Sequence, residues 1–151
     1  MVHMSIKNDL QNALTEAIKS SQTLRKSTLR LALASIKNAE IEARGELEDD
    51  LVLNLLQKEV KARQETIEGA QQAKRPDLIS KAEEEIAILY EFLPRPLSQE
   101  ELKALVREAI QESGATSLAE IGKVMAVLMP KIRGKADGKE ANQIVREMLQ
   151  P

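Results

Sequence analysis

The sequence of 151 residues contains no cysteine and a single histidine, His3. Without a thiol the chain has no disulfide bond and no thiolate ligand for a metal. Met4 and the SIKND that follows it are typical of a natural start, so residues 1–3 are interpreted as a cloning remnant. Setting them aside leaves no histidine, which excludes serine–histidine and cysteine–histidine nucleophiles. We therefore predict no catalytic residue, no metal site and no cofactor.

Aromatic residues are also scarce, since Tyr90 and Phe92 are the only two. The core must then be built from aliphatic side chains and methionine, and there is no aromatic platform on which bases could stack. No apolar run approaches the roughly 18 residues of a membrane span, so no membrane association is expected. Charge is nearly balanced, with 22 Lys and Arg against 24 Asp and Glu, so nucleic-acid binding would have to come from local patches. The lack of cysteine is compatible with a reducing compartment, and we expect a cytoplasmic protein.

The spacing of apolar residues is helical nearly throughout and predicts an all-α protein. Four helices are expected in an N-terminal domain, residues 4–93. They cover about residues 6–19 and 24–43, a third stretch from about 48–50 to 69–74, and a fourth that starts after Pro76. Pro94 and Pro96 stop the fourth helix and hold the chain extended, so residues 94–97 are predicted to form a proline-rich linker.

Residues 98–151 are predicted to form a C-terminal tail of three short helices. Each helix opens on a residue that can cap it, with an acid three positions later. The expected caps are Ser98, Ser117 and Asp137, each worth about 1 kcal/mol if replaced by alanine. Gly134 and Gly138 are expected to be turn glycines. Asn142, one turn into the last helix, can bond to the preceding loop or face RNA, and we favour the loop.

Two other patterns carry little functional information. The segment GKADGK, residues 134–139, has three residues between its glycines where a phosphate-binding P-loop has four, and Glu140 follows where Ser or Thr is required. Carboxylate pairs such as Asp49 and Asp50 are more often solvated helix surface than catalytic groups. A serine–lysine dyad stays open, but no residue in the sequence singles one out. Catalysis by this chain alone is not expected.

A first basic region lies near the N-terminus, where residues 19–37 hold five cations and no acid. Three of them, at spacings i, i+4 and i+11, share one helix face and are called the N-terminal basic stripe: Lys26, Arg30 and Lys37. We weigh two interpretations. The stripe is either a solvated face paired with acids of a neighbouring helix, which is the favoured reading, or a surface that faces phosphates.

A second basic region, called here the C-terminal basic cluster, consists of Lys131, Arg133, Lys135 and Lys139. A helix is expected to end near Pro130 and the next to begin after Asp137, so these cations would surround a helix N-terminus whose N–H groups favour anions. Lys123 and Arg146 are expected to flank them from adjacent helices. Residues 121–151 hold six cations and three acids, a local charge of +3. The alternative is a solubilising loop near a helix cap.

The residues of this second region also carry a resemblance. GKVMAVLMPKIRGKADGKEANQIVREML (122–149) resembles the tail of the GatB/YqeY family. This family joins free-standing YqeY-like proteins to the tail of the B subunit of the glutamine-dependent aminoacyl-tRNA amidotransferase. LRLALASIKNAEIEARGEL (29–47) and LLQKEVKARQETIE (55–68) are similar to the N-terminal part of the free-standing members. The similarity covers nearly the whole chain from Met4.

The resemblance implies an all-helical fold in two parts and an association with tRNA, whose body the B-subunit tail contacts while the chemistry occurs elsewhere. A module without aromatic residues would recognise RNA by shape and charge, with a steep dependence on salt. The expected function is therefore a non-catalytic, tRNA-binding accessory module. Two alternatives are a helical protein–protein adaptor and an accessory subunit for a carbon–nitrogen ligase with glutamine as amido-N-donor. That ligase role would require an amidotransferase or synthetase as a protein partner.

Overall fold

The computed structural model describes residues 5–150, and the interpreted cloning remnant, residues 1–3, lies outside this range. Within it, all regular structure is helical and no strand is present, which confirms the predicted all-α class. The chain divides into two compact units, Met1–Pro94 (unit 1) and Arg95–Pro151 (unit 2). Each unit has its own apolar core, and each is described separately.

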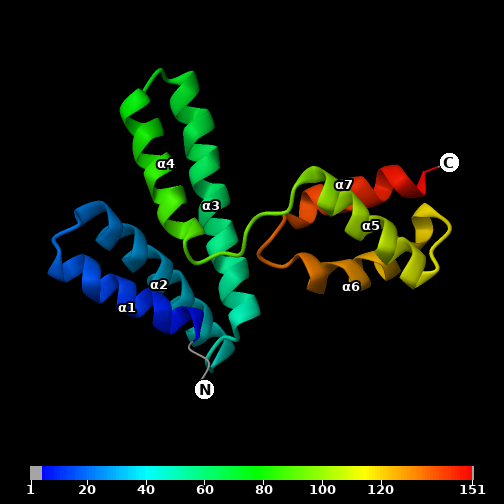
Figure 1. Cartoon of the computed structure of the whole chain (residues 1–151), viewed down its shortest axis with the longest axis horizontal. Coiled ribbons are helices and arrows are strands. Elements are labelled where there is room, and N and C mark those ends of the chain that lie inside the picture. The colour runs from blue at the N-terminus through cyan, green and yellow to red at the C-terminus, as the bar shows by residue number, and fades with distance from the viewer. Residues whose placement is uncertain (1–4, 151) are drawn as a thin grey trace. The chain divides into compact units, whose positions relative to one another are not determined.

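Unit 1 consists of four helices: α1 (Ile6–Lys19), α2 (Thr23–Ala43), α3 (Asp49–Gln72) and α4 (Pro76–Tyr90) (Figure 1). The local sequence sets several of their ends. Ser5 Oγ accepts a hydrogen bond from Asn8 N at the start of α1. Pro76 occupies the first position of α4, where its missing N–H breaks no helical bond.

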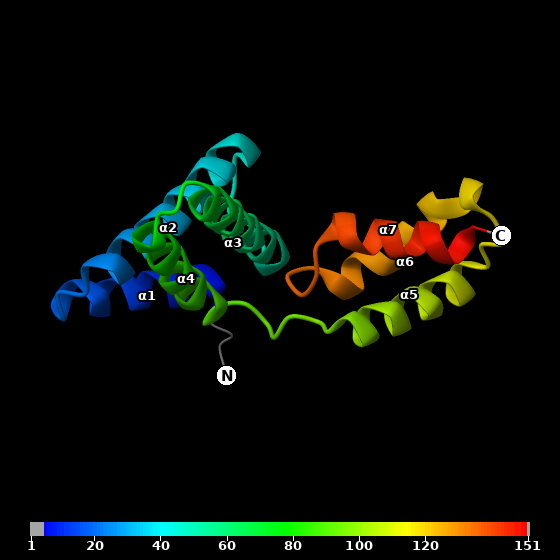
Figure 2. The same cartoon turned by 90° about the horizontal axis from the view of Figure 1, so that it is seen from above.

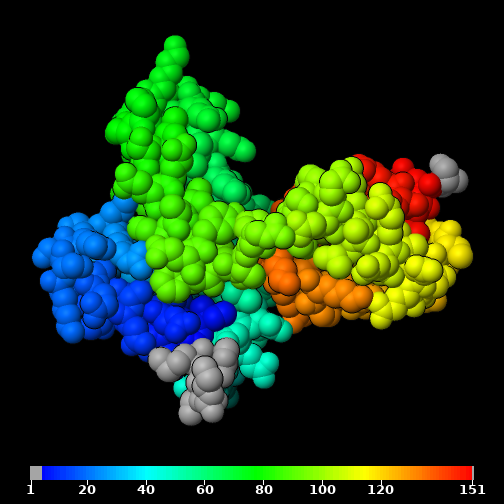
Figure 3. Space-filling view, viewed as in Figure 1, coloured from blue at the N-terminus to red at the C-terminus, as the bar shows by residue number. Residues whose placement is uncertain are grey.

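The core of unit 1 is aliphatic and lies around α2, which packs against the three other helices. Leu10, Leu29, Ile36, Leu56 and Leu89 are fully buried. Helices α3 and α4 pack against each other over most of their length and form a hairpin. The tip of this hairpin projects from the rest of unit 1 (Figure 3).

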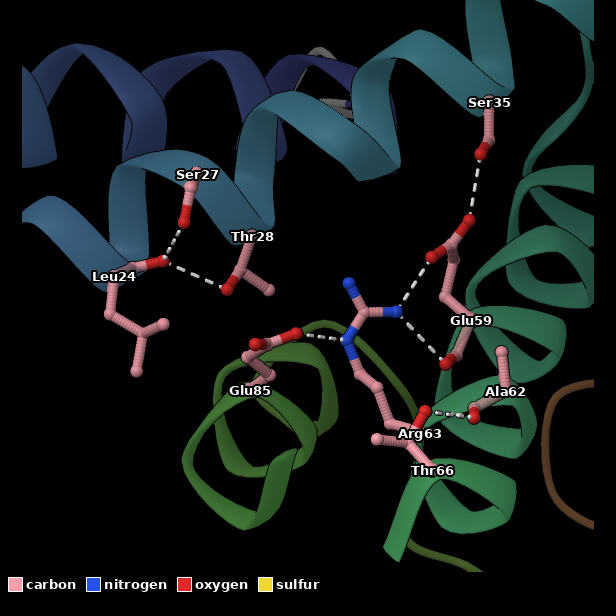
Figure 4. A network of polar contacts seen from close by, with 9 residues as sticks. All are labelled: Leu24, Ser27, Thr28, Ser35, Glu59, Ala62, Arg63, Thr66 and Glu85. Carbon is pink, nitrogen blue, oxygen red and sulfur yellow. Dashed lines mark hydrogen bonds and ion pairs between the residues drawn. The ribbon is translucent and has the colours of Figure 1, made fainter. Parts of the chain in front are cut away.

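One charged side chain, Arg63 of α3, is buried in unit 1 with 8% of its surface exposed. Its Nε donates to Glu85 Oε2 on α4 at 2.6 Å, and its Nη1 donates to Glu59 Oε2 at 2.6 Å (Figure 4). Ser35 of α2 donates to the other oxygen of Glu59 at 2.7 Å. The network thus connects α2, α3 and α4. Burial tends to lower the pKa of Arg63, but the two carboxylates together raise it, so the guanidinium stays charged.

Unit 2 consists of α5 (Gln99–Ser113), the short 3₁₀ helix η1 (Leu118–Glu120), α6 (Ile121–Ile132) and α7 (Gly138–Leu149). Helices α5, α6 and α7 pack against one another, with α6 and α7 side by side (Figure 2). Val106, Val124, Leu128, Ile132 and Val145 are fully buried between them. Ser98 Oγ accepts from Glu101 N at 3.1 Å at the start of α5. Gly114 ends this helix with φ of 73°, the left-handed conformation that glycine adopts at little cost.

Three local expectations for unit 2 differ from the structure. Ser117 precedes η1 but its side chain makes no capping bond, because the 3₁₀ turn uses the backbone oxygen of Ser117 to accept from Glu120 N. The helix expected to end near Pro130 ends two residues later, at Ile132; because Pro130 has no N–H, the carbonyl four positions earlier receives no helical bond from it. Gly138 is no turn glycine, because it is the first residue of α7.

Candidate nucleic-acid interface

The loop between α6 and α7 carries the centre of the C-terminal basic cluster. Gly134 has φ of 75°, the left-handed conformation that turns the chain immediately after Arg133. The backbone N–H groups of Lys135 and Ala136 both donate to the carbonyl of Ile132, at 2.9 and 3.1 Å. The loop is therefore a closed turn with a defined backbone conformation.

Two contacts from a distant part of the sequence hold this loop in place. Leu97 N donates to the carbonyl of Lys135 at 2.9 Å, and Gln99 Nε2 donates to Glu140 Oε1. Leu97 also packs against the core of unit 2. The segment after Pro96 thus belongs to unit 2 and supports the basic loop, a role that local sequence patterns gave no reason to expect because the partners lie about 40 positions apart.

The N-terminus of α7 is already capped by an acid. Asp137 Oδ1 accepts a hydrogen bond from Lys139 N at 3.2 Å, and Glu140 adds a second carboxylate in the first turn. These negative charges compete with any external anion for the helix end. The two carboxylates therefore weaken the attraction of this helix end for an external anion, so the basic side chains are the stronger source of attraction for phosphate.

Two of the predicted cations are held by acids. Lys131 Nζ lies 2.8 Å from Glu112 Oε2 on α5, and this hydrogen bond raises the pKa of Lys131 above its ordinary value. Lys123 Nζ lies 3.5 Å from Glu120 Oε2 one turn earlier. Both lysines are exposed, but each has a carboxylate that partly cancels its charge. The sequence analysis did not predict the ion pair between Lys131 and Glu112, because Glu112 lies on a different helix, α5.

Other cations of the cluster remain more available. Lys135 and Lys139 are exposed, and within residues 5–150 neither side chain forms an ion pair. Arg133 differs from these two lysines, because it is half-buried and is not without a partner. Arg146 is exposed and donates from Nε to Asn142 Oδ1 at 2.8 Å, which leaves its charge uncompensated by an acid. Asn142 therefore orients an arginine of its own helix, instead of bonding to the preceding loop as expected.

The N-terminal basic stripe lies along α2. Arg30 and Lys37 are exposed and Lys26 is half-buried, and among the described residues no acid is paired with any of the three. The reading in which a neighbouring helix supplies paired acids is therefore wrong for these side chains. Their neighbour Arg25 does have such a partner, since its Nη1 lies 2.5 Å from Glu91 Oε2.

The described part of the chain offers neither a metal site nor a membrane-spanning helix. No group of three or more His, Cys, Asp or Glu side chains there could hold a metal ion. None of the helices in residues 5–150 has the length and apolar character needed to cross a membrane. The basic surfaces are thus the features of the structure that a functional account has to explain.

Comparison with known proteins gives the chain its relatives. It is 30% identical over 146 residues to "Altered inheritance of mitochondria protein 41, mitochondrial" of Pyrenophora tritici-repentis, which covers 93% of this chain and 78% of that protein. The protein of the same name in Lachancea thermotolerans is 35% identical over 107 residues, 69% of this chain and 57% of that protein. An uncharacterized protein of Schizosaccharomyces pombe is 35% identical over 89 residues, 59% of this chain and 72% of that protein.

The comparisons contradict the predicted cytoplasmic location and confirm the predicted family. Four of five curated relatives carry the word mitochondrial in their names, so the expected cytoplasmic location is wrong as a statement about this group of proteins. The family described as Yqey-like protein matches residues 7–149. Because this match covers nearly the whole chain, the protein belongs to the Yqey-like family, as the resemblance of its C-terminal segment predicted.

Proposed function

We propose that this protein is a non-catalytic accessory module that binds the backbone of tRNA through the C-terminal basic cluster. The observation that carries the proposal is a pair of exposed, unpaired cations: Lys135 on the α6–α7 loop and Lys139 in the first turn of α7. Leu97 holds the loop at Lys135, and Gln99 holds the start of α7 at Glu140. A loop fixed on a rigid scaffold presents its charges in one arrangement, so less conformational entropy is lost on binding.

The exposed side of α7 extends this surface with polar groups. Lys139, Gln143 and Arg146 are exposed at spacings i, i+4 and i+7, which puts them on one face of the helix. Asn142 fixes the guanidinium of Arg146 by accepting from its Nε. Lysine, arginine and amide side chains are the donors that contact phosphate and sugar oxygens in nucleic-acid complexes.

The same surface lacks what base recognition requires. The whole sequence has one Tyr, one Phe and no Trp, and both aromatic residues are in unit 1. Stacking on unpaired bases is therefore not available to unit 2. The proposal is accordingly limited to recognition by shape and charge, and it assigns the contact to the three-helix part. In this account residues 94–97 join that part to the four-helix part, which is left for another partner.

The test is the binding of bulk tRNA to the full chain across about 50 to 200 mM salt. Contacts with about three phosphates predict a log–log slope of about −2 to −3. The double variant Lys135→Glu, Lys139→Glu should lose most of this binding and flatten the slope. Lys58→Glu, Lys81→Glu makes the same change in net charge on exposed side chains of α3 and α4, and should bind as wild type does.

Two results would contradict the proposal. The first is wild-type binding that is absent or insensitive to salt. The second is an equal loss in both double variants, which would mean that net charge and not this surface governs binding. Circular dichroism of each variant separates loss of binding from loss of fold, because all four lysines are exposed and their replacement should leave the helices intact.

A further inference from the structure

Helix α2 presents one face to solvent that combines apolar and basic side chains. Leu31 and Ile41 are 56% and 65% exposed, the two highest values among the large apolar residues of the described chain. They lie ten positions apart, which places them about 80° apart around the helix axis on its solvent side, with exposed Ala34 between them. Arg30 and Lys37 lie beside this apolar line. These five residues are called the α2 face.

The position of α2 in unit 1 explains why this face is uncovered. The opposite side of the helix supplies Thr28, Leu29, Ala32 and Ile36 to the core, where it meets α1, α3 and α4. The three other helices of unit 1 therefore all pack against the buried side of α2, and none of them covers its exposed side. A shallow depression of about 300 Å³, lined by Lys37, Glu40, Ile41, Gly45 and Glu46, adjoins the C-terminal end of the face.

Charge on the α2 face favours an acidic ligand. Within residues 5–150 neither Arg30 nor Lys37 has an acid as a partner. The nearest acid along the helix, Glu40, is already bound by Lys7 Nζ at 2.7 Å and accepts from Leu47 N at 3.1 Å. The middle of the face thus carries two positive charges without an acid partner, while at its C-terminal end exposed Glu42 directly follows Ile41.

We propose that the α2 face docks an amphipathic helix of a partner protein, with an apolar stripe against Leu31 and Ile41 and acidic residues against Arg30 and Lys37. Ala34 lies between the apolar anchors, and so small a side chain lets a second helix approach closely. This interaction goes beyond the proposed binding of tRNA and uses a different unit of the chain.

The same observations disfavour two other occupants. RNA would satisfy Arg30 and Lys37, but its phosphates give Leu31 and Ile41 no apolar surface to bury against, and α2 carries no aromatic residue for stacking. A second copy of the same face would bring Arg30 and Lys37 against their own counterparts, and like charges at an interface oppose association. An acidic helix satisfies both the apolar and the charged residues.

The experiment selects helices from a displayed library against the full chain. Every library member carries an apolar stripe at spacings i, i+3, i+4 and i+7, and its flanking positions are randomised among Glu, Gln and Lys. We expect the selected helices to be enriched in Glu over Lys at these flanks. The best synthetic helix should then bind at least about tenfold more weakly to Leu31→Glu, Ile41→Glu than to wild type.

Matched variants identify the source of the effect. Ile18→Glu, Leu78→Glu puts the same two charges on other exposed apolar residues of unit 1, 48% and 38% exposed on α1 and α4, and should leave the affinity unchanged. Arg30→Gln, Lys37→Gln should abolish the preference for Glu over Gln at the flanks. Selection of lysine-rich or charge-indifferent helices, no enrichment at all, or equal binding by Leu31→Glu, Ile41→Glu would overturn the proposal. If Leu31→Glu, Ile41→Glu loses the tRNA binding of the wild type, the α2 face binds RNA instead. If the wild type is a dimer and Leu31→Glu, Ile41→Glu is a monomer, the α2 face binds a second copy of the chain.

Discussion

The two units of this chain place their charges differently. Unit 1 buries Arg63 among three helices, whereas residues 95–150 of unit 2 bury no charged or polar side chain. Unit 1 therefore adds a buried ion network to its aliphatic core, whereas the core of unit 2 is aliphatic throughout. Because its charges are not needed for folding, unit 2 can use them on its surface for binding.

The basic surface on α2 and the C-terminal basic cluster differ in the side chains that surround their cations. The cations of α2 lie beside exposed Leu31 and Ile41, whereas Lys135 lies on a polar loop and Lys139 lies in the first turn of the helix that follows it, α7. A similar number of positive charges therefore favours a protein helix at one surface and a phosphate backbone at the other. The neighbouring side chains, and not the count of cations, decide which partner is expected.

The largest predicted effect concerns the buried network of unit 1. Arg63→Ala leaves the carboxylates of Glu59 and Glu85 without their cation, and the loss of one partner of a buried ion pair costs about 3–5 kcal/mol. Hydrogen exchange of the full chain should show lower protection of amides in α2, α3 and α4, with those of α5, α6 and α7 unchanged. The exposed control Lys58→Ala should cost less than about 0.5 kcal/mol. A cost below about 1 kcal/mol for Arg63→Ala would show that the network does not hold the three helices together.

An intermediate effect is expected from two serines that look alike in sequence. Ser98 Oγ accepts from Glu101 N, so Ser98→Ala should destabilise the protein by about 1 kcal/mol. The side chain of Ser117 makes no capping bond, so Ser117→Ala should change stability by less than about 0.5 kcal/mol. Denaturant unfolding of both variants measures the difference. Equal values for the two variants would mean that the capping geometry at Ser98 does not contribute.

The smallest effect is expected from pH, because the carboxylate concerned is in contact with solvent. The hydrogen bond from Lys7, aided by the N–H of Leu47, lowers the pKa of Glu40 below its ordinary value. A carboxyl group whose pKa is lowered by folding stabilises the protein above its unfolded pKa, and this contribution is lost as pH falls through the folded pKa. Unfolding midpoints between about pH 6 and pH 3 should therefore fall less steeply in Glu40→Gln than in wild type. If the unfolding midpoints of the two proteins fall equally with pH, Glu40 does not contribute to the pH dependence of stability.

Local sequence patterns were sufficient for some of these features but not for others. The all-α class follows from apolar spacing, which each helix carries by itself. The burial of Arg63 could not be predicted, because its acids lie on α3 and α4 and only the packed hairpin brings Glu85 to it. The exposure of Leu31 and Ile41 was hidden as well, since α2 has apolar residues on several sides and only its neighbours decide which side is covered.

The sequence predicted which cations form the C-terminal basic cluster, but it did not predict which of them are paired with acids. The cations of the C-terminal basic cluster could be read directly from the sequence, whereas their acids come from elsewhere in unit 2. Glu112 reaches Lys131 from α5, a contact that only the packed helices create, whereas the cap at Asp137 was predicted from the sequence. Such cancellation depends on tertiary contacts, so a count of cations along the chain overestimates the charge offered to a ligand.

The most direct test of the central claim compares two charge-reversal variants in one assay. Lys135→Glu, Lys139→Glu and Arg30→Glu, Lys37→Glu change the net charge of the chain by the same amount, and all four side chains are exposed. In titrations with bulk tRNA at about 100 mM salt, the first variant should lose at least about tenfold in affinity while the second stays close to wild type. An equal loss in both variants, or a greater loss in the second, would contradict the assignment of RNA to unit 2 and of a protein partner to α2.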